Sequence, residues 1–246
     1  MNIINQLVGH DNLFIHLINL YNRNILPNKI LLSGEKGIGK FLFASHFLNF
    51  ILSQNEDNKY NLNEFVINKN SKSFILFNNN IHPNILLIKK KNDKKKIDIL
   101  QIREMIQFQN NSSFNNKVKF VIIDNVSDLN INSTNALLKS IEQPNNNVFY
   151  LLTHNNGELI QDTLRSRCIK FKMLLSKTSK KLIINNYFNE DIYDSLSQGI
   201  TNYYSNPSFI ISLIDYLRDN SLDYKDVEIE DIMKLIIKNN DYTKNK

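Results

Sequence analysis

The sequence predicts an α/β fold with a parallel sheet covered by helices on both faces, followed by a small helical domain. Short apolar runs that suit buried strands alternate with stretches of helical periodicity up to about residue 175. Beyond that residue only helical patterns follow. A glycine-rich loop stands between the first apolar run and the helix after it, and this order of strand, loop and helix is typical of phosphate-binding α/β proteins.

The first elements are a helix, a strand and a second helix. Apolar residues at helical spacing predict a helix at Asp11–Asn22, with Asp11 as its candidate N-cap. A strand is expected at Lys29–Leu32 and, after the glycine loop, a helix from Lys40 to about Leu52. The polar stretch Gln54–Asn70 that follows is expected to be a mobile helix or a loop.

Four more strands and three helices complete the α/β region. The strands are expected at Asn84–Ile88, Lys117–Ile123, Val148–Leu152 and Ile169–Met173, and the helices at Ile97–Phe108, Asn132–Ile141 and Leu159–Leu164. The run Lys117–Ile123 is almost wholly apolar, as in a parallel strand that is buried on both faces. The basic run Lys89–Lys96 is expected to be a solvated loop, with contact to phosphate as the alternative. Further helices are then expected at Lys177–Phe188, Glu190–Gln198, Ser208–Leu217 and Glu228–Lys238.

Composition narrows the class of protein. Hydrophobic residues make up 42% of the 246 residues, which is enough to bury a core. No apolar run is long enough to cross a bilayer and no signal peptide is recognisable, so we expect a cytoplasmic protein without membrane contact. The single cysteine, Cys168, excludes an internal disulfide and a cysteine-based zinc site. The net charge of +6 is compatible with nucleic-acid binding, but an excess of Asn, Ile and Lys also follows from AT-rich coding, which we favour as the explanation.

The glycine-rich loop matches the phosphate-binding pattern G-x-x-x-x-G-K-[ST] except at its last position. Gly34, Gly39 and Lys40 fit, with Gly37 between them, but Phe41 stands where Ser or Thr is required. The backbone and the lysine of such a loop hold phosphates, whereas the hydroxyl binds Mg²⁺. Phenylalanine binds no metal, so the sequence predicts no metal site and a nucleotide site that is weak or empty. The alternative is an ordinary turn between a strand and a helix.

An acidic residue follows the third expected strand. Asp124 comes directly after Phe120–Ile123, the arrangement in which ATPases orient Mg²⁺ beside the phosphate loop. In such enzymes a Glu usually comes next and activates the attacking water, but here the residue is Asn125, which has no carboxylate. Phe41 and Asn125 therefore remove a metal ligand and a general base independently. We expect no ATPase activity from this chain.

Three motifs indicate a family. Residues 135–144 have the sequence Asn-Ala-Leu-Leu-Lys-Ser-Ile-Glu-Gln-Pro, residues 148–154 have Val-Phe-Tyr-Leu-Leu-Thr-His, and residues 164–168 have Leu-Arg-Ser-Arg-Cys. Together they resemble the bacterial DNA polymerase III clamp-loader subunits, which are AAA+ proteins. Val-Gly-His at 8–10, His-Pro-Asn-Ile-Leu at 82–86 and Ile-Arg-Glu at 102–104 fit the same family. The resemblance is strong over residues 5–175 and weak over 176–217.

The degraded nucleotide site is similar to that of the delta-prime branch of this family, which often lacks working ATPase motifs yet keeps Ser-Arg-Cys. The resemblance implies that Arg167, in the motif Ser166-Arg167-Cys168, acts in trans as an arginine finger on the γ-phosphate of ATP bound to a neighbouring subunit. The alternative is a surface arginine that caps a short helix or pairs with an acid. Cys168 itself is expected to pack in the core.

The resemblance also places two nucleotide sensors. Thr153 fits the first sensor position, and an ordinary strand-end threonine is an equal alternative. His154 is expected to be a turn residue. The second sensor is normally an arginine, and residues 206–210 contain none. With one cysteine, the zinc module of many family members cannot form, so neither zinc nor any other cofactor is expected to be required.

The family resemblance implies an AAA+ domain at residues 1–175, a helical lid at 176–217 and a reduced or missing collar with a polar tail at 218–246. It implies a stator of the DNA polymerase III holoenzyme. The expected partners are the gamma/tau motor subunits and delta and, through the complex, the sliding clamp and primed DNA. An ATP-hydrolysing motor subunit of the same complex and a DNA-binding, initiator-like AAA+ protein are the alternatives.

Overall fold

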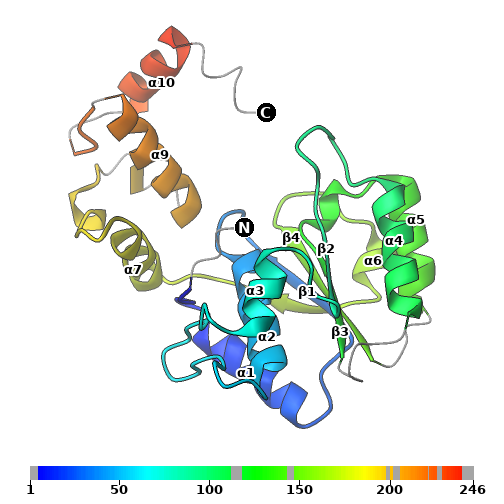
Figure 1. Ribbon diagram of the computed structural model, residues 1–246. Helices are drawn as coiled ribbons and strands as arrows, with labels where there is room; N and C mark the ends of the chain where they lie inside the picture. The colour runs from blue at the N-terminus through cyan, green and yellow to red at the C-terminus, as the bar shows by residue number, and fades with distance from the viewer. Residues whose placement is uncertain are drawn as a thin grey trace. The chain divides into compact units, whose positions relative to one another are not determined.

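The computed structural model describes residues 5–111, 118–142, 147–197, 200–201, 206–220, 222–225 and 229–239. The chain divides into two compact units, Met1–Leu174 and Leu175–Lys246 (Figure 1). Gln143 and Pro144 of the family motif and most of the expected polar tail lie outside the described residues.

The first unit contains a five-stranded sheet in the order β2-β3-β4-β1-β5. The strands are β1 (Lys29–Gly34), β2 (Ile85–Ile88), β3 (Lys119–Ile123), β4 (Val148–Asn155) and β5 (Ile169–Lys172). Every pairing is parallel, which confirms the expected sheet. The pairs Ser33–His154 and Gly34–Asn155 extend β1 and β4 beyond their expected ends. The expectation that His154 is a turn residue is therefore wrong, because the ladder to β1 carries β4 through it.

Helices cover both faces of this sheet (Figure 1). They are α1 (Asp11–Asn22), α2 (Lys40–Ser53), α3 (Lys72–Asn78), α4 (Ile99–Asn110), α5 (Ile131–Glu142) and α6 (Asp162–Arg165), with a short 3-10 helix, η2 (Val126–Asp128). The helix at α3 was not expected from the sequence. Asp11 lies in the first turn of α1, not at its N-cap, which is His10.

On one face, α4, α5 and α6 share a core with the alternate residues of β3 and β4. Its members include Val121, Ile123, Val148, Tyr150, Ile102, Leu137 and Leu164. Two lysines connect strand starts to helix ends: Lys29 Nζ donates to the Ile141 carbonyl at 3.1 Å, and Lys119 Nζ donates to the Phe108 carbonyl at 2.6 Å. A cation at a helix C-terminus satisfies carbonyls that lack an intrahelical donor and complements the helix dipole.

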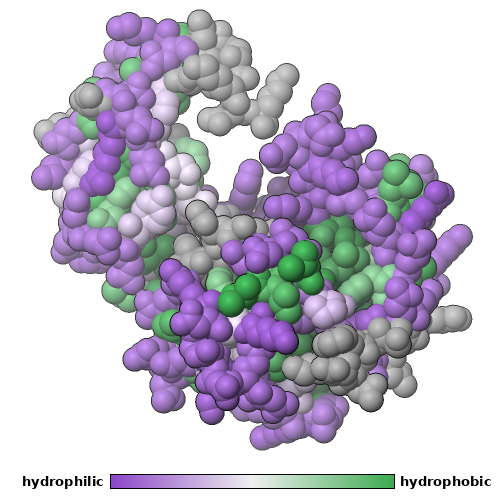
Figure 2. Space-filling view, in the orientation of Figure 1, coloured by the Kyte–Doolittle hydropathy of each residue, from purple (hydrophilic) through white to green (hydrophobic). Residues whose placement is uncertain are grey.

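On the other face, aromatic rings join α1 and α2 to the segment Gln54–Asn70. Phe14 of α1 packs edge-to-face against Phe43 and Phe47 of α2, with ring centroids 5.6 and 6.2 Å apart. Tyr60 is buried and its hydroxyl lies 2.9 Å from His46 Nδ1. The segment Gln54–Asn70 is therefore a loop tied to the core by a buried aromatic side chain. On the face drawn in Figure 2 the surface of this unit is mostly hydrophilic, as expected when its apolar side chains lie beneath the helices.

The second unit is helical. It contains α7 (Lys177–Phe188), the 3-10 helix η3 (Tyr193–Ser195), α9 (Pro207–Asp219) and α10 (Ile229–Lys238). Its core includes Ile184, Tyr193, Ile210, Leu213, Ile214 and Ile232. The division into a lid and a collar at residue 218 stays a prediction.

The expected helix at Glu190–Gln198 is wrong within the described residues, because only the three residues of η3 are helical there. The turn before η3 is held by Asn185 of α7, whose Oδ1 accepts hydrogen bonds from the backbone N–H groups of Ile192 and Tyr193 at 3.1 and 3.0 Å. Leu196, which follows η3, has an extended backbone with φ of −70° and ψ of 141°, so the helical geometry ends there.

Candidate functional site

The carboxyl ends of β3, β4 and β1 meet at one edge of the sheet, because the three strands are parallel neighbours. This edge is where ligands bind in open α/β sheets. The glycine loop follows β1, Asp124 follows β3, and Thr153 lies near the end of β4. The topology thus gathers the nucleotide-site residues that the sequence predicted, although they are far apart along the chain.

The glycine loop has a backbone that side chains would disturb. A Cβ atom on Gly34 would lie 2.5 Å from Ile38 Cδ1 and 2.6 Å from the Met173 carbonyl oxygen. Gly37 and Gly39 have φ angles of 80° and 87°, a left-handed conformation that favours glycine. His10 contacts this loop through a hydrogen bond, since its Nε2 lies 2.9 Å from the Ile38 carbonyl oxygen.

The side chain of Lys40, the first residue of α2, folds back onto the glycine loop. Its Nζ donates to the carbonyl oxygens of Gly34 at 3.1 Å and Glu35 at 2.5 Å. Burial lowers the pKa of Lys40 to about 8, while the negative charges of Asp124 and Glu158 act in the opposite direction. The ammonium group that would hold phosphates thus already has backbone partners.

Thr153 and Asp124 are hydrogen-bonded to each other. The Thr153 hydroxyl donates to Asp124 Oδ1 at 3.0 Å and accepts from the Asn125 backbone N–H at 2.7 Å. The side chain of Thr153 is buried, and its single hydroxyl proton is engaged. This geometry favours the strand-end alternative for Thr153, and the sensor role stays a prediction. Burial raises the pKa of Asp124, against the lowering effects of the Thr153 hydrogen bond and the charge of Lys40.

Asn125 stands where ATPases of this kind usually have Glu, and its side-chain amide donates two hydrogen bonds. Its Nδ2 donates to Glu158 Oε2 at 2.8 Å and to Asp128 Oδ2 at 3.2 Å, which engages both amide protons. Its φ of 63° is left-handed, a conformation that Asn adopts more readily than Glu. Its Oδ1 atom is buried without a partner among the described residues.

Glu158 brings a carboxylate to this edge from the turn after β4. Its Oε1 accepts from Asn155 Nδ2 at 2.9 Å, and its backbone carbonyl accepts from His154 Nε2 at 3.1 Å. Although burial alone would raise the pKa of Glu158, the hydrogen bonds from Asn155 and Asn125 hold it below its ordinary value. Glu158 therefore stays ionised at neutral pH, close enough to act electrostatically on Lys40.

Arg167 lies just after α6 and is exposed at 37% of its side chain. Its guanidinium donates to Glu142 Oε1 at 2.7 Å and to the Thr163 carbonyl at 2.9 Å. Arg167 therefore pairs with an acid, which agrees with the alternative of a surface arginine. Its role as an arginine finger for a neighbouring subunit stays a prediction. The neighbouring Ser166 hydroxyl donates to the same Thr163 carbonyl at 3.2 Å. Cys168 is buried in the core, and burial raises the pKa of its thiol to about 11.

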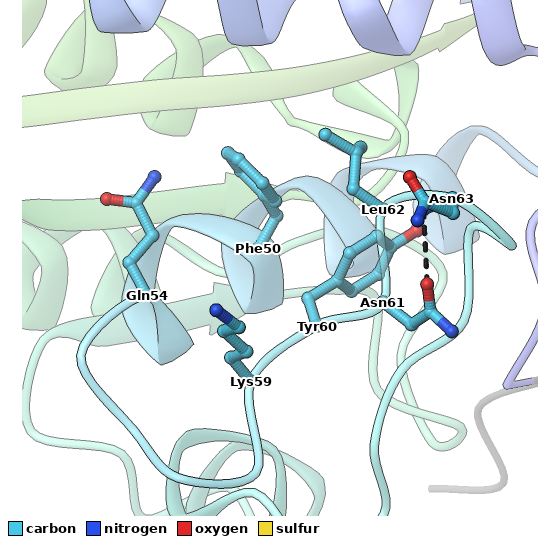
Figure 3. Close-up of a pocket in the computed structure, with 7 residues that line it drawn as sticks. All are labelled: Phe50, Gln54, Lys59, Tyr60, Asn61, Leu62 and Asn63. Carbon is cyan, nitrogen blue, oxygen red and sulfur yellow. Dashed lines mark hydrogen bonds between the residues drawn. The ribbon is translucent and has the colours of Figure 1, made fainter.

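A basic run and a surface hollow are two further features of this unit. The lysines of the Lys89–Lys96 run are exposed, and Lys96 Nζ donates to the Ser127 carbonyl at 2.6 Å. A hollow of about 500 Å³ is lined by Phe50, Gln54, Lys59, Tyr60, Asn61, Leu62 and Asn63. Phe50 lies near the end of α2 that is remote from the glycine loop, Gln54 is the C-cap of that helix, and the other residues belong to the segment after it (Figure 3). This hollow is therefore separate from the nucleotide site.

No group of three or more His, Cys, Asp or Glu side chains in the described part of the chain is arranged to hold a metal ion. No helix there is both long and apolar enough to span a bilayer.

A family model decides the relationship. Residues 9–176, more than half of the chain, match the family described as DNA polymerase III, delta subunit. The chain belongs to this family. The resemblance deduced from the sequence motifs is thereby confirmed.

The relatives of this chain include delta' and gamma/tau subunits of DNA polymerase III. DNA polymerase III subunit delta' of Pseudomonas aeruginosa is 28% identical over 140 residues, 57% of this chain and 41% of the relative. The delta' subunit of Buchnera aphidicola subsp. Baizongia pistaciae is 31% identical over 173 residues, 64% of this chain and 49% of the relative. The gamma/tau subunit of Mycoplasma genitalium is 30% identical over 179 residues, 73% of this chain and 28% of the relative. The chain thus spans less than half the length of each of these relatives.

Solved structures support the fold of this family member. Two variants of RuvB from Thermotoga maritima superpose with TM-scores of 0.52 and 0.51, at 17% and 16% identity, over 94% of this chain in each case. The matches cover 76% and 70% of the two RuvB chains. At this identity the likeness concerns the fold alone, and it confirms the predicted α/β fold.

Sequence reasoning missed two acids of the site. Glu142 stood inside the family motif without an assigned role, and Glu158 was not singled out. A signal for Glu158 was present: it follows closely after β4, and the ends of adjacent parallel strands meet at one edge, beside Asp124. The pairing of Glu142 with Arg167 had no such signal, because it depends on how the end of α5 packs near α6.

Proposed function

We propose that this chain is a delta-prime-like stator of a bacterial replicative clamp loader. It supports the loading of the sliding clamp at primed DNA and supplies Arg167 to ATP bound by a neighbouring gamma/tau motor subunit. It does not hydrolyse ATP itself and requires no cofactor. Membership of the delta family and two delta' relatives among the three named above support this proposal.

The observation that carries the proposal is the internally satisfied nucleotide site. Lys40 donates to Gly34 and Glu35, and both amide protons of Asn125 are bonded to acids. Phe41 supplies no metal ligand and Asn125 no general base. Each such group contributes about 10²-fold or more to catalysis, so the loss of both removes hydrolysis.

Arg167 supplies the active role that we propose for this chain. An arginine finger stabilises the charge that develops on the transferred phosphoryl group, and it accelerates hydrolysis by about 10³- to 10⁵-fold in well-studied cases. The Arg167 guanidinium is partly exposed, and it follows a short helix within the Ser-Arg-Cys motif. An arginine that a partner subunit must reach has to be accessible in this way.

The experiment is reconstitution with the motor and delta subunits, sliding clamp and primed DNA. Co-purification tests membership of the complex. In the assembled complex, Arg167→Ala is expected to lower clamp-dependent ATPase activity about tenfold or more. Arg165→Ala is the matched control, because Arg165 is a neighbouring exposed arginine with only a 4.0 Å contact to Asp162. Unchanged activity of the Arg167→Ala complex would show that the finger assignment is wrong.

A motor subunit is the second candidate, because the gamma/tau subunit of Mycoplasma genitalium is 30% identical over 73% of this chain. A motor would turn over ATP in isolation, and Lys40→Ala would abolish that turnover. For the stator we expect no turnover and at most weak binding of labelled ATP. Turnover that depends on Lys40 would decide in favour of the motor.

A further inference from the structure

We infer that Glu142 is the positioning residue of Arg167, an inference that rests on the proposed trans role of that arginine. Glu142 is the last residue of α5, and Arg167 follows α6. The distance of 2.7 Å between Arg167 Nη2 and Glu142 Oε1 is that of a charge-assisted hydrogen bond. The pair therefore joins two segments that are 25 positions apart in the sequence.

A second contact fixes the plane of the guanidinium. Arg167 Nη1 donates to the Thr163 carbonyl at 2.9 Å. An arginine has five N–H donors in a planar fork, and the others have no partner among the described residues. Glu142 and Thr163 thus hold one part of the fork and leave the rest for oxygens of a phosphate. A phosphate accepts this geometry well.

Stability alone does not explain an acid at this position. A negative charge in the last turn of a helix opposes the helix dipole, and Glu142 ends α5. The pair is also solvent-exposed, at 37% for Arg167 and 48% for Glu142, and exposed ion pairs contribute little to folding. What Glu142 does provide is a fixed direction for a long, flexible side chain. Such preorganisation acts on the rate of a reaction, since a misdirected group stabilises the transition state poorly.

The test uses the reconstituted complex with clamp and primed DNA. Glu142→Ala is expected to lower the kcat of the clamp-dependent ATPase about tenfold and leave KM unchanged, because the interaction matters in the transition state. Glu142→Gln should recover most of this loss, since its amide oxygen still accepts from Arg167. In an Arg167→Ala background, Glu142→Ala should cause no further loss.

The matched control is Glu190→Ala. Glu190 pairs with Arg218 at 2.9 Å, and the two side chains have 56% and 38% exposure, close to those of the Glu142–Arg167 pair. This variant should keep full activity. Thermal unfolding of each variant of the free chain should match the unmodified chain, as expected for exposed pairs.

The outcomes separate the two claims. If Arg167→Ala lowers the ATPase and Glu142→Ala does not, or raises it, the positioning role is wrong and the proposed function stands. An equal loss from Glu190→Ala, or no recovery by Glu142→Gln, also overturns the positioning role. If Arg167→Ala itself has no effect, the proposed trans function fails, whatever Glu142 does.

Discussion

The side-chain amide of Asn125 meets the carboxylate of Glu158 at 2.8 Å. The carboxylate at this edge of the sheet therefore comes from the turn after β4, while the position after Asp124 carries a donor. Asp128 is bonded to the same amide at 3.2 Å. With Asn at position 125, one side-chain amide therefore holds two acids together.

Restoring the acid with Asn125→Glu should therefore destabilise the fold without creating ATPase activity. The new carboxylate would face Glu158 and Asp128 in place of a donor, at a residue whose φ is 63°. We expect a loss of about 2–3 kcal/mol in the free energy of unfolding, measured in urea at pH 7. Like charges raise carboxyl pKa values in the folded state, so the folded state binds more protons and the loss should shrink towards pH 5.

Asn125→Gln is the control for this substitution, because it has the size of Glu and keeps the amide. The difference between the two variants isolates the charge. Equal stability of the two variants at pH 7, or the appearance of ATP turnover in Asn125→Glu, would contradict this account of the network.

The buried charge of Lys40 should appear in the pH dependence of stability. The folded pKa of about 8 lies below the ordinary value of 10.5, so between these pH values the unfolded state binds more protons and stability rises with pH. Lys40→Met has no such group. The stability of the unmodified chain relative to this variant should therefore rise from pH 8 to about pH 10, measured by urea unfolding. A difference between the two proteins that stays flat from pH 8 to about pH 10 would contradict the prediction.

The sheet was predictable from the sequence because buried parallel strands are continuous apolar runs, as Lys119–Ile123 shows. Strand ends were less predictable. His154 is polar, yet it continues β4 because Ser33 of β1 is its ladder partner. Within the described residues, the helix expected at Glu190–Gln198 is limited to η3, because the backbone becomes extended at Leu196.

The candidate site was predictable where a residue type carries its own chemistry, as in Phe41 and Asn125. The partners of those residues were not predictable. Thr153 on Asp124, and Glu142 on Arg167, are contacts set by the order of strands and the packing of helices. A motif names the residues of a site, and the tertiary structure decides which of their hydrogen-bonding groups remain free.

The first glycine of the loop should be required for folding, independently of any nucleotide. In Gly34→Ala the new Cβ would meet the Met173 carbonyl oxygen at 2.6 Å and Ile38 Cδ1 at 2.5 Å. The Met173 atom belongs to the backbone and cannot turn away as a side chain can. We expect a loss of about 1–3 kcal/mol in the free energy of unfolding, from overpacking.

Gly157→Ala separates overpacking from backbone strain. Gly157 has a φ of +85° but open space around its Cβ position, so only strain of about 1 kcal/mol is expected. If Gly34→Ala unfolds at the same urea concentration as the unmodified chain, the loop has room that the structure does not show.

Glu158 should oppose nucleotide binding. Its ionised carboxylate acts on Lys40, the residue that would hold the phosphates, and a triphosphate would bring further negative charge to the same edge. Glu158→Gln removes this charge, while its amide oxygen still accepts a hydrogen bond from Asn125 or Asn155. We expect the variant to bind a fluorescent ATP analogue on the order of tenfold more tightly, which corresponds to about 1.4 kcal/mol.

The charge origin of this gain can be checked with salt, because screening weakens interactions between accessible charges. The difference between Glu158→Gln and the unmodified chain should therefore narrow as ionic strength rises. Glu104→Gln is the control, since Glu104 is exposed on α4 and is not bonded to the site. If both variants bind the analogue as the unmodified chain does, Glu158 is not the obstacle. The carbonyl partners of Lys40 would then be the reason why the loop resists phosphate, since a bound phosphate would have to displace them.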